Sequence, residues 1–432
     1  MLHQRKESQM RRKRHVLALL VVAAAVSVAL VTAGSGAAGR TANGPSGWVG
    51  KATPLVGTGG AYGESYVAPA STLTHALFSS KLLPANKAAK NISLAAYGRS
   101  SRTVNYALAL KCWKNNGCST GTGGKDTVAY VEGFGENTYR QMSKMEFILQ
   151  ALTYPQIGKI IYRSAHSDLN QAIADFKSMI AQHVSAIVTY PDFGDAMLPV
   201  FQQATKAGIP VSTYAWGYVT GPGKNYTTVV GENTCKLGQA FAGVMNSKVK
   251  SGNIAFLGGF PGNPLSAGWQ NCEQKALNPS IKVVSNQPTN WDPSKVQGIV
   301  AGILANTPDL AGLSYEDALF MSQGGYAAYQ AAGIPYEGVF TYRTDEAGMG
   351  CLWDKLKDPK LQVYYYSAGN AQIRVALTAD MMKLAGAKIP PTIVFPIQLQ
   401  NQATRDMCLK GYPSTASGTS LIPVSLLKQM YP

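Results

Sequence analysis

The sequence predicts an α/β protein of two doubly wound parallel-sheet lobes, and three observations support this fold class. From Thr127 onward, short β-rich runs alternate with longer amphipathic stretches at a spacing of roughly 25–30 residues, which is typical of βα units around a parallel sheet. Two such sets follow each other along the chain. Between them, the stretch 217–225 contains Gly and Pro and interrupts both periods, so we expect the lobes to separate there.

The elements of each lobe follow from local composition. Runs rich in β-branched and aromatic residues predict the strands of the first set at 127–131, 159–164, 185–190 and 209–214. Amphipathic stretches predict the helices between them at 138–153, 168–183 and 194–207. The same patterns predict the second set of strands at 227–232, 253–259, 281–286, 311–315, 337–342 and 361–367.

The first 40 residues have the order of a secretory signal peptide. Basic residues at 11–14 precede an apolar run at 16–33, and small residues follow at 34–39. We therefore expect an exported protein, periplasmic or at the cell surface. An uncleaved anchor is the alternative, because the apolar run approaches the roughly 20 residues that span a bilayer. No cysteine precedes Cys112, so the cysteine that a lipoprotein signal would modify is missing.

Residues 41–125 are rich in Gly, Ser, Ala and Thr, with helical patches near 71–83 and 100–115 and the run STGTGG at 119–124. We interpret this region as an N-terminal extension that ends in a flexible linker. Its role, as a spacer or as a cap on one lobe, is left open by the composition.

The charge balance argues against a nucleic-acid partner. The formal net charge is +16, but without residues 1–40 it falls to +10, with 32 basic against 22 acidic residues. The remaining positive residues are scattered, with no block of like charges after the signal, so they predict a solvated basic surface.

The six cysteines are an even number, which fits disulfides in an oxidising compartment. Cys112 and Cys118 bracket a short polar segment, so a local bridge between them is our first expectation. The other four lie far apart in sequence and their pairing is open. These four are unlike the close pairs of a zinc site, and the chain has five histidines and no HExxH motif, so we expect neither a metal site nor a cofactor.

One long stretch carries a family resemblance. SDLNQAIADFKSMIAQHVSAIVTYPDFGDAMLPVFQQATKAGIPV (167–211) is similar to the ribose-binding class of periplasmic solute-binding proteins. Further matches follow in family order and spacing: VVGENTCKLGQ (229–239), IAFLGGFPGN (254–263), ILANTPDLAGLSYED (303–317) and KLAGAKIP (383–390). The resemblance covers about residues 126–400.

This resemblance implies a type I periplasmic binding protein-like fold, in which a three-segment hinge joins the two lobes. The first lobe is then expected at 126–220 and 370–393, the second at 225–369 and 394–410, and a C-terminal tail at 411–432. It also implies that a monomer encloses a small solute between the lobes and presents it to a membrane permease of the ABC type. Ligands of open α/β sheets collect outside the carboxyl ends of the strands, which agrees with a crevice between two such sheets.

The resemblance places aromatic ligand contacts on both lobes. After the first strand, Phe134, Asn137 and Tyr139 occupy the family positions for an Asn and for rings that stack on a sugar, and Trp291 matches the aromatic position of the second lobe. An aromatic face suits the apolar side of a sugar ring. A Tyr packed at the start of a helix is the structural alternative for Tyr139.

The polar positions of the family are partly changed. Asp317 matches a ligand-binding Asp, and its neighbour Glu316 stands where the family has an Asn; Asp345 lies near a second such Asp. Where the family has charged residues, this chain has Trp216 and Trp269. After the late strand, where a Gln is common in the family, it has Asn370. These changes predict a pocket that is more aromatic and less charged than a ribose site, although Trp216 and Trp269 also fit a core position.

Together these features predict an exported solute-binding protein without enzymatic activity, with a carbohydrate as the expected solute. A nucleoside or another aromatic-compatible solute is the alternative ligand. A ligand-sensing ectodomain held by an uncleaved N-terminal helix is the alternative role. A sugar hydrolase would need two positioned carboxylates, and Asp317 and Asp345 would pair only by accident of the fold.

Overall fold

A computed structural model describes residues 83–100, 102, 104–135, 137–214, 219–366, 369–397, 399–401, 408–409 and 411–431. These residues belong to one compact unit, Asn43–Pro432. The expected signal peptide or anchor at 1–40, most of the helical patch at 71–83 and Trp216 lie outside the described residues. Among the described residues, no helix has both the length and the apolar character needed to span a membrane.

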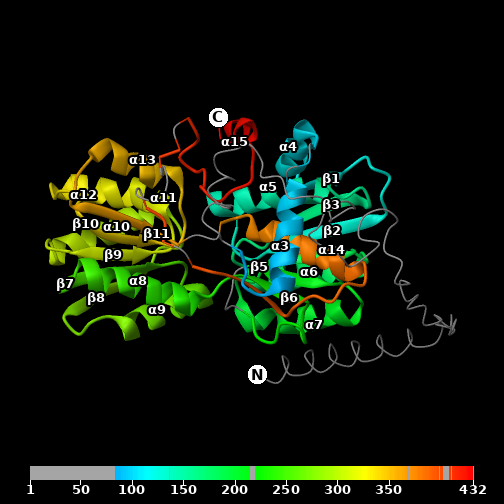
Figure 1. Ribbon diagram of the computed structural model, residues 1–432, viewed down its shortest axis with the longest axis horizontal. Helices are drawn as coiled ribbons and strands as arrows, with labels where there is room; N and C mark the ends of the chain where they lie inside the picture. Colours follow the sequence, from blue (N-terminus) through cyan, green and yellow to red (C-terminus); the bar gives the residue numbers. More distant parts are fainter. Residues whose placement is uncertain are drawn as a thin grey trace, which may run out of the picture. The chain divides into compact units, whose positions relative to one another are not determined.

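The first lobe is built on a seven-stranded sheet (Figure 1). In spatial order its strands are β1 (Gly117–Ser119), β3 (Ile157–Ser164), β2 (Asp126–Glu132), β4 (Ala186–Tyr190), β5 (Val211–Tyr214), β6 (Thr228–Glu232) and β12 (Thr392–Phe395). All neighbouring pairs are parallel except β1 with β3, which is antiparallel.

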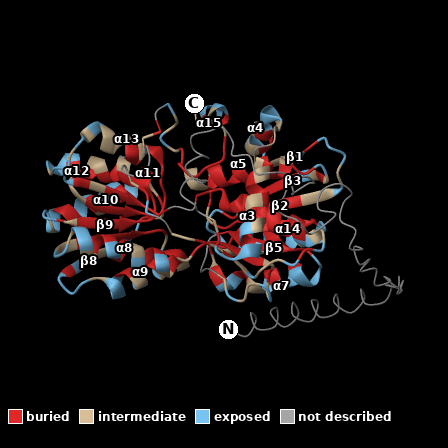
Figure 2. Ribbon diagram, in the orientation of Figure 1, coloured by how far each residue is buried: buried red, intermediate tan, exposed pale blue. Residues whose placement is uncertain are grey.

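Alternate residues of β2 pack against helices on opposite faces of this sheet. Val128 and Tyr130 belong to the buried cluster that includes α3 (Lys87–Ser100), α5 (Thr138–Leu152) and α14 (Gln372–Leu384). Ala129 and Val131 belong to the cluster that includes α6 (Leu169–Ala181), the 3-10 turn η1 (Gly194–Met197) and α7 (Leu198–Lys206). Because successive side chains of a strand point to opposite faces, apolar residues at every position produce a sheet covered on both sides. The central strands β4, β5 and β6 are accordingly buried at every residue, and β2 at all but its first two (Figure 2).

The second lobe repeats this plan with a five-stranded parallel sheet. Its order is β11 (Leu361–Tyr365), β10 (Gly338–Tyr342), β9 (Gly312–Tyr315), β7 (Gly252–Gly258) and β8 (Ile281–Pro288). One face packs against α8 (Thr234–Lys248) and α9 (Pro264–Ala276). The other packs against α10 (Pro293–Asn306), α11 (Ala318–Phe320), the π-helical turn η2 (Met321–Gly325), α12 (Tyr326–Ala332) and α13 (Ala347–Leu356). The prediction of two parallel-sheet α/β lobes is confirmed.

Helices α8 and α9 approach each other closely at Gly238. A Cβ atom at this position would lie 2.0 Å from the backbone oxygen of Trp269, so only glycine fits the contact. The disulfide Cys235–Cys272 links the same two helices.

The boundary between the lobes differs from the one predicted. Strand β6 pairs with β5 and β12 in the first sheet, so the Gly- and Pro-containing stretch before it joins two neighbours of one sheet. The crossing comes after Glu232, where the chain passes directly from β6 into α8. The other expected crossings lie between β11 and α14 and after β12, so β12 belongs wholly to the first lobe.

The last part of the predicted extension is integrated into the first lobe. Helix α3 contacts α5 and α14, helix α4 (Tyr106–Lys114) contacts α5, and β1 forms an edge of the sheet. The predicted bridge Cys112–Cys118 is confirmed and connects α4 to β1. The run at 119–124 is fixed by Thr120 and Thr122, whose hydroxyls donate to the backbone oxygen of Ile157 (2.7 and 2.8 Å).

The C-terminal segment (residues 411–431) contacts both lobes. On the second lobe, the amides of Ala347 and Gly348 donate to the backbone oxygens of Ala416 and Ser414 (2.7 and 2.8 Å), and the disulfide Cys351–Cys408 holds the preceding chain against α13. On the first lobe, the amide of Leu421 donates to Glu146 (2.7 Å), and α15 (Val424–Met430) contacts α4. The segment predicted as a tail is therefore a fourth connection between the lobes.

Candidate functional site

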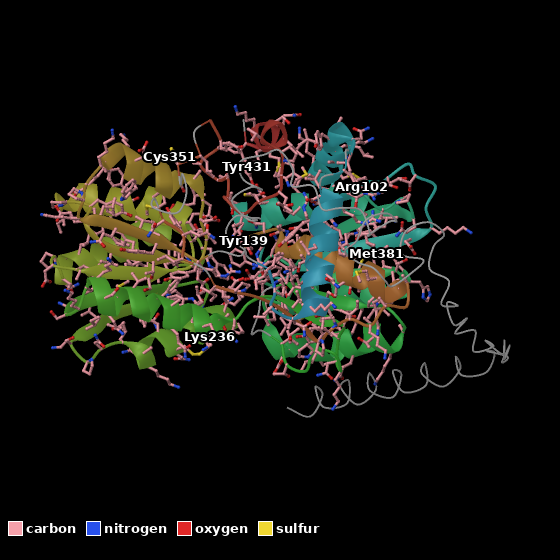
Figure 3. All side chains as sticks on the ribbon, in the orientation of Figure 1. Arg102, Tyr139, Lys236, Cys351, Met381 and Tyr431 are labelled. Atoms are coloured by element: carbon pink, nitrogen blue, oxygen red, sulfur yellow. A yellow bond between two sulfur atoms is a disulfide. The ribbon has the colours of Figure 1, made fainter. Side chains whose placement is uncertain are left out.

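A small pocket lies where carboxyl ends of strands from both sheets meet. The first lobe contributes the start of α5, which follows β2, and the end of β4; the second contributes residues that follow β7, β8, β9 and β10. The lining residues are Asn137, Tyr139, Arg140, Tyr190, Leu265, Trp291, Glu316, Asp317, Arg343 and Thr344. This is the place where open α/β sheets bind ligands. Figure 3 shows Tyr139 on the side of the first lobe that faces the second.

The lobes are close together around this pocket. The cavity measures about 20 Å³, which is room for about one water molecule. Phe134 of the first lobe meets Trp291 edge to face (4.7 Å between ring centroids) and stacks on Phe260 (6.0 Å) of the second lobe. A solute the size of a monosaccharide therefore enters only when the lobes or these side chains move apart.

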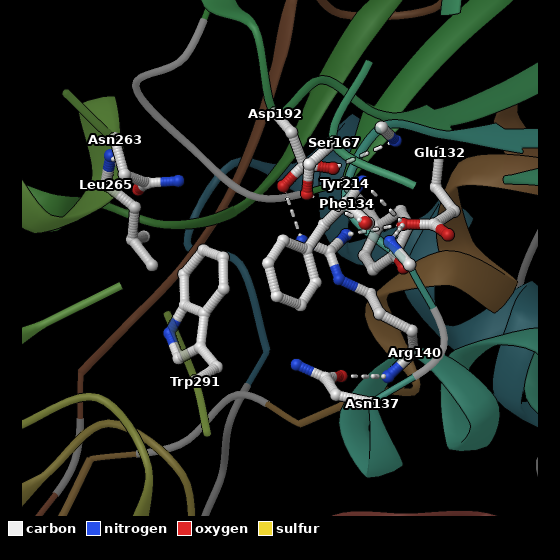
Figure 4. Close-up of polar contacts among 12 residues, drawn as sticks. Glu132, Phe134, Asn137, Arg140, Ser167, Asp192, Tyr214, Asn263, Leu265 and Trp291 are labelled. Carbon is white, nitrogen blue, oxygen red and sulfur yellow. Dashed lines mark hydrogen bonds and ion pairs between the residues drawn. The ribbon is translucent and has the colours of Figure 1, made fainter. Parts of the chain in front are cut away.

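Arg140 is the central charge of the first-lobe wall. Its Nη2 donates to Asp192 Oδ1 at 2.6 Å, and its Nη1 lies 3.9 Å from Glu132 Oε2 (Figure 4). The guanidinium carbon is 3.3 Å from the ring centroid of Tyr190, which is a cation–π contact. The side chain of Asn137 caps α5 by accepting from the amide of Arg140 (3.0 Å), so the cap also fixes where the arginine leaves the helix.

Glu316 organises the second-lobe wall. Its carboxylate accepts from Ser266 Oγ (2.5 Å), Trp269 Nε1 (2.9 Å) and Trp291 Nε1 (2.8 Å). Burial raises the pKa of Glu316, and these three hydrogen bonds act in the opposite direction.

Asp317 begins α11 as its N-cap and accepts from the amide of Phe320 (3.0 Å). Burial raises the pKa of Asp317 to about 7, and the neighbouring charge of Glu316 adds to the rise, although the backbone hydrogen bond from Phe320 lowers it. This wall therefore holds two buried carboxyl groups side by side, and Asp317 gains or loses its proton near neutral pH.

Arg343 lines the pocket and bridges the two lobes. Its Nε pairs with Glu232, the last residue of β6, and Gln372 donates to the other oxygen of the same carboxylate (2.8 Å). Its guanidinium carbon also lies 5.5 Å from the ring centroid of Tyr139. A buried ion pair thus crosses the hinge in this conformation.

Five predicted site residues line the pocket: Asn137, Tyr139, Trp291, Glu316 and Asp317. Phe134 lies beside it, in contact with Trp291. The chemistry available there is hydrogen bonding and stacking. Within the described ranges, no three His, Cys, Asp or Glu side chains are grouped closely enough to bind a metal ion.

Three predicted site residues lie elsewhere in this structure. Trp269 is fully buried behind the pocket, between Phe241 and Phe256. Asp345 accepts from Ser417 of the C-terminal segment. The side chain of Asn370 donates to the backbone oxygen of Tyr139 (2.9 Å) and to Ser143 Oγ (2.9 Å), and so joins α5 to the hinge. Each makes a hydrogen bond within the protein through a polar atom of its side chain.

The pocket is also more charged than the sequence predicted, because Arg140 and Arg343 were missed. Arg140 directly follows Tyr139 and Arg343 lies two residues before Asp345, so both stand beside positions that the sequence analysis had selected. Arg343, Tyr190 and Thr344 each lie at or just after the end of a strand. These three residues could have been found from the sequence by selecting the polar and aromatic side chains at every predicted strand end.

Comparison with known proteins agrees with this architecture. The sequence model of the periplasmic binding protein domain family matches residues 128–388. The chain belongs to this family. Its relative in Bacillus subtilis (strain 168), the ribose import binding protein, is 24% identical over 246 residues, which is 56% of this chain and 77% of the relative.

Solved structures of sugar-binding proteins share the fold. The solute-binding protein of an ABC transporter from Actinobacillus succinogenes 130z, with bound D-allose, has a TM-score of 0.54 and 22% identity, and covers 64% of this chain and 97% of its own. A Mycobacterium smegmatis protein in complex with β-D-fucofuranose has a TM-score of 0.55 and 21% identity, over 65% and 92%. The fructose-binding periplasmic domain of a hybrid two-component system has a TM-score of 0.57 and 19% identity, over 66% and 94%.

Proposed function

We propose that this protein is an exported sugar-binding protein that captures its ligand between the two lobes and delivers it to an ABC-type permease, without catalysing a reaction. One observation carries the proposal: both lobes place aromatic and charged side chains around a single pocket. Trp291, Tyr139 and Tyr190 offer ring faces for the apolar side of a sugar, while Arg140 and Asp317 offer a donor and an acceptor for hydroxyl groups.

The mechanism that fits this geometry is hinge closure. The pocket is nearly filled when the lobes are in contact, so a ligand must bind to a more open form and be enclosed afterwards. Closure then brings second-lobe groups onto a ligand already held by the first lobe, and the closed shape is what a permease would recognise.

A thermal-shift panel on residues 41–432 tests the proposal. The panel contains D-ribose, D-allose, D-fructose, L-arabinose and myo-inositol, with uridine and an amino acid for comparison. A bound sugar at about 100 times its Kd stabilises the fold by about 2.7 kcal/mol, which raises Tm measurably.

Two variants place the binding at the pocket. Replacing Tyr139 by Ala should abolish the shift, because it removes a ring of the lining. Replacing the exposed Tyr106 on α4 should leave it unchanged. A panel in which every sugar is silent would refute the proposal.

A sensing ectodomain is the second candidate. The apolar run at 16–33 and the similarity to a periplasmic domain of a two-component system favour it. N-terminal sequencing of the mature protein separates the two roles, since a chain that begins near residue 40 lacks the apolar run 16–33 that would hold it in the membrane.

A further inference from the structure

The carboxylate of Glu316 is enclosed by neutral hydrogen-bond donors. Trp269 Nε1 and Ser266 Oγ, both on α9, donate to Oε1, and Trp291 Nε1, from the loop between β8 and α10, donates to Oε2. Glu316 itself follows β9 and is only 2% exposed. One side chain therefore ties three segments of the second lobe together at the edge of the pocket.

Trp291 has a backbone conformation that needs such support. Asn290 and Trp291 have φ values of 55° and 49°, in the left-handed region that bulky residues rarely adopt. Residues keep such a conformation where contacts with their neighbours hold them in it, and these residues cluster at ligand sites. Here the amide of Trp291 donates to Thr289 Oγ1 (3.1 Å) and its indole N–H donates to Glu316.

Gly259 lies against the indole ring of Trp291. A Cβ atom at Gly259 would lie 2.2 Å from Cζ2 of Trp291, so the ring rests directly against the backbone of this glycine. The ring is thus fixed at its nitrogen by Glu316 and along its six-membered ring by Gly259. Phe134 approaches it from the first lobe (Figure 4).

We propose that Glu316 is a positioning residue that fixes the plane of the Trp291 ring for sugar stacking and does not itself bind the sugar. The inference rests on the proposed function and refines it. Because Glu316 occupies the indole N–H, Trp291 offers a ligand its π face and no hydrogen-bond donor. Trp291 then selects for an apolar C–H face on the sugar, and the selection depends on a residue behind it.

A double-mutant cycle on affinity tests this role, with the panel sugar that raises Tm most as the probe. Replacing Glu316 by Gln keeps the size of the side chain but turns one acceptor into a donor, which faces either an indole N–H or the Ser266 hydroxyl. We expect Kd to rise about tenfold or more in Glu316→Gln, and to change less than about twofold when the same substitution is made in Trp291→Phe. Effects that add in the double variant would show direct contact with the sugar and overturn the proposal.

Two further variants separate positioning from general packing. Gly259→Ala displaces the indole while the carboxylate stays intact, so it should weaken binding as Glu316→Gln does. Trp269→Phe removes the other indole donor, which is buried behind the pocket, and should leave Kd within about threefold. If Trp269→Phe weakens binding as much as Glu316→Gln, the carboxylate acts through packing and the proposal is wrong.

A measurement without ligand distinguishes failure of this inference from failure of the proposed function. The indole ¹H–¹⁵N resonance of Trp291, assigned by its loss in Trp291→Phe, should move upfield in Glu316→Gln because the hydrogen bond to a carboxylate is lost. An unchanged resonance would overturn the inference even if sugars bind. If no sugar binds but the resonance moves, the sugar-binding function fails, and with it the role of Glu316 in stacking, while the contact between the two side chains stands.

Discussion

Glu146 connects α5 to α14 and to the C-terminal segment, and a mutant cycle can measure both connections. It is fully buried on α5; one carboxylate oxygen pairs with Arg374 of α14, and the other accepts from Ser420 Oγ (2.8 Å) and the amide of Leu421 (2.7 Å). Arg374 is 2% exposed, and its Nη1 also donates to Gln150 Oε1 (3.3 Å). The perturbations are Glu146→Leu, Arg374→Met and both together.

The expected magnitudes follow from these contacts. Removing one partner of a buried ion pair costs about 3–5 kcal/mol, because the other charge stays buried without compensation. Glu146→Leu also leaves two donors of the C-terminal segment without an acceptor, at about 1–3 kcal/mol each. The double variant carries no buried charge, so we expect it to lose only the second contribution and to be more stable than Glu146→Leu.

Urea unfolding followed by circular dichroism measures these free energies. The difference between the double variant and the sum of the single variants gives the coupling of the pair, which the losses expected for the two single variants place at about 6–10 kcal/mol. A coupling below about 1 kcal/mol, the range of solvent-exposed pairs, would mean that water reaches this pair and would refute the reasoning from burial.

The remaining predictions concern other parts of the molecule. Burial raises the pKa of Asp317 to about 7, so the contribution of Asp317 to the stability of the wild type falls as pH rises from about 4 to 7. Asp317→Asn lacks this titration, so the stability of the variant minus that of the wild type should be about 1–4 kcal/mol greater at pH 8 than at pH 4. Thermal melts of both proteins at the two pH values measure this difference. Gly238→Ala should lower the free energy of unfolding by about 1–3 kcal/mol through overpacking, whereas Gly243→Ala on the exposed side of the same helix, with open space around it, should raise it by about 0.5–1 kcal/mol. Equal effects of the two glycine substitutions in denaturant titrations would contradict the close approach. Replacing Cys351 and Cys408 by Ser opens a link across a sequence separation of 57 and should cost about 4 kcal/mol, and an unchanged Tm would show that the loop is held by its other contacts.

The strands were predictable because both faces of each sheet are covered. Runs such as 127–131 and 253–259 are apolar at nearly every position, and they lie within a residue or two of β2 and β7. The lobe boundary was not predictable from breaker residues. The chain crosses at Glu232 and Asn233 without a loop, and the Gly- and Pro-containing stretch 217–225 serves a connection within one sheet.

The site was predictable where one motif contains both the strand end and the side chain. Asn137 and Tyr139 follow β2, and Glu316 and Asp317 follow β9. The roles of Trp269 and Asp345 depend on what packs against them, which is Phe241 and Phe256 for the first and the C-terminal segment for the second. Such long-range packing has no signal in the local sequence, so a position at a strand end does not say whether its side chain faces the pocket.

The path of the chain through the sheets also constrains the order in which the lobes can be completed. All five strands of the second sheet lie between Gly252 and Tyr365, so that lobe has its whole sheet available as one continuous piece of chain. The first sheet begins with β1 but needs β12 at its far edge, and its covering helix α14 begins only at Gln372. As the chain grows from its N-terminus, the first lobe must remain with an open edge and an uncovered apolar face until nearly the last residues arrive, and during that interval it is the lobe that is exposed to aggregation.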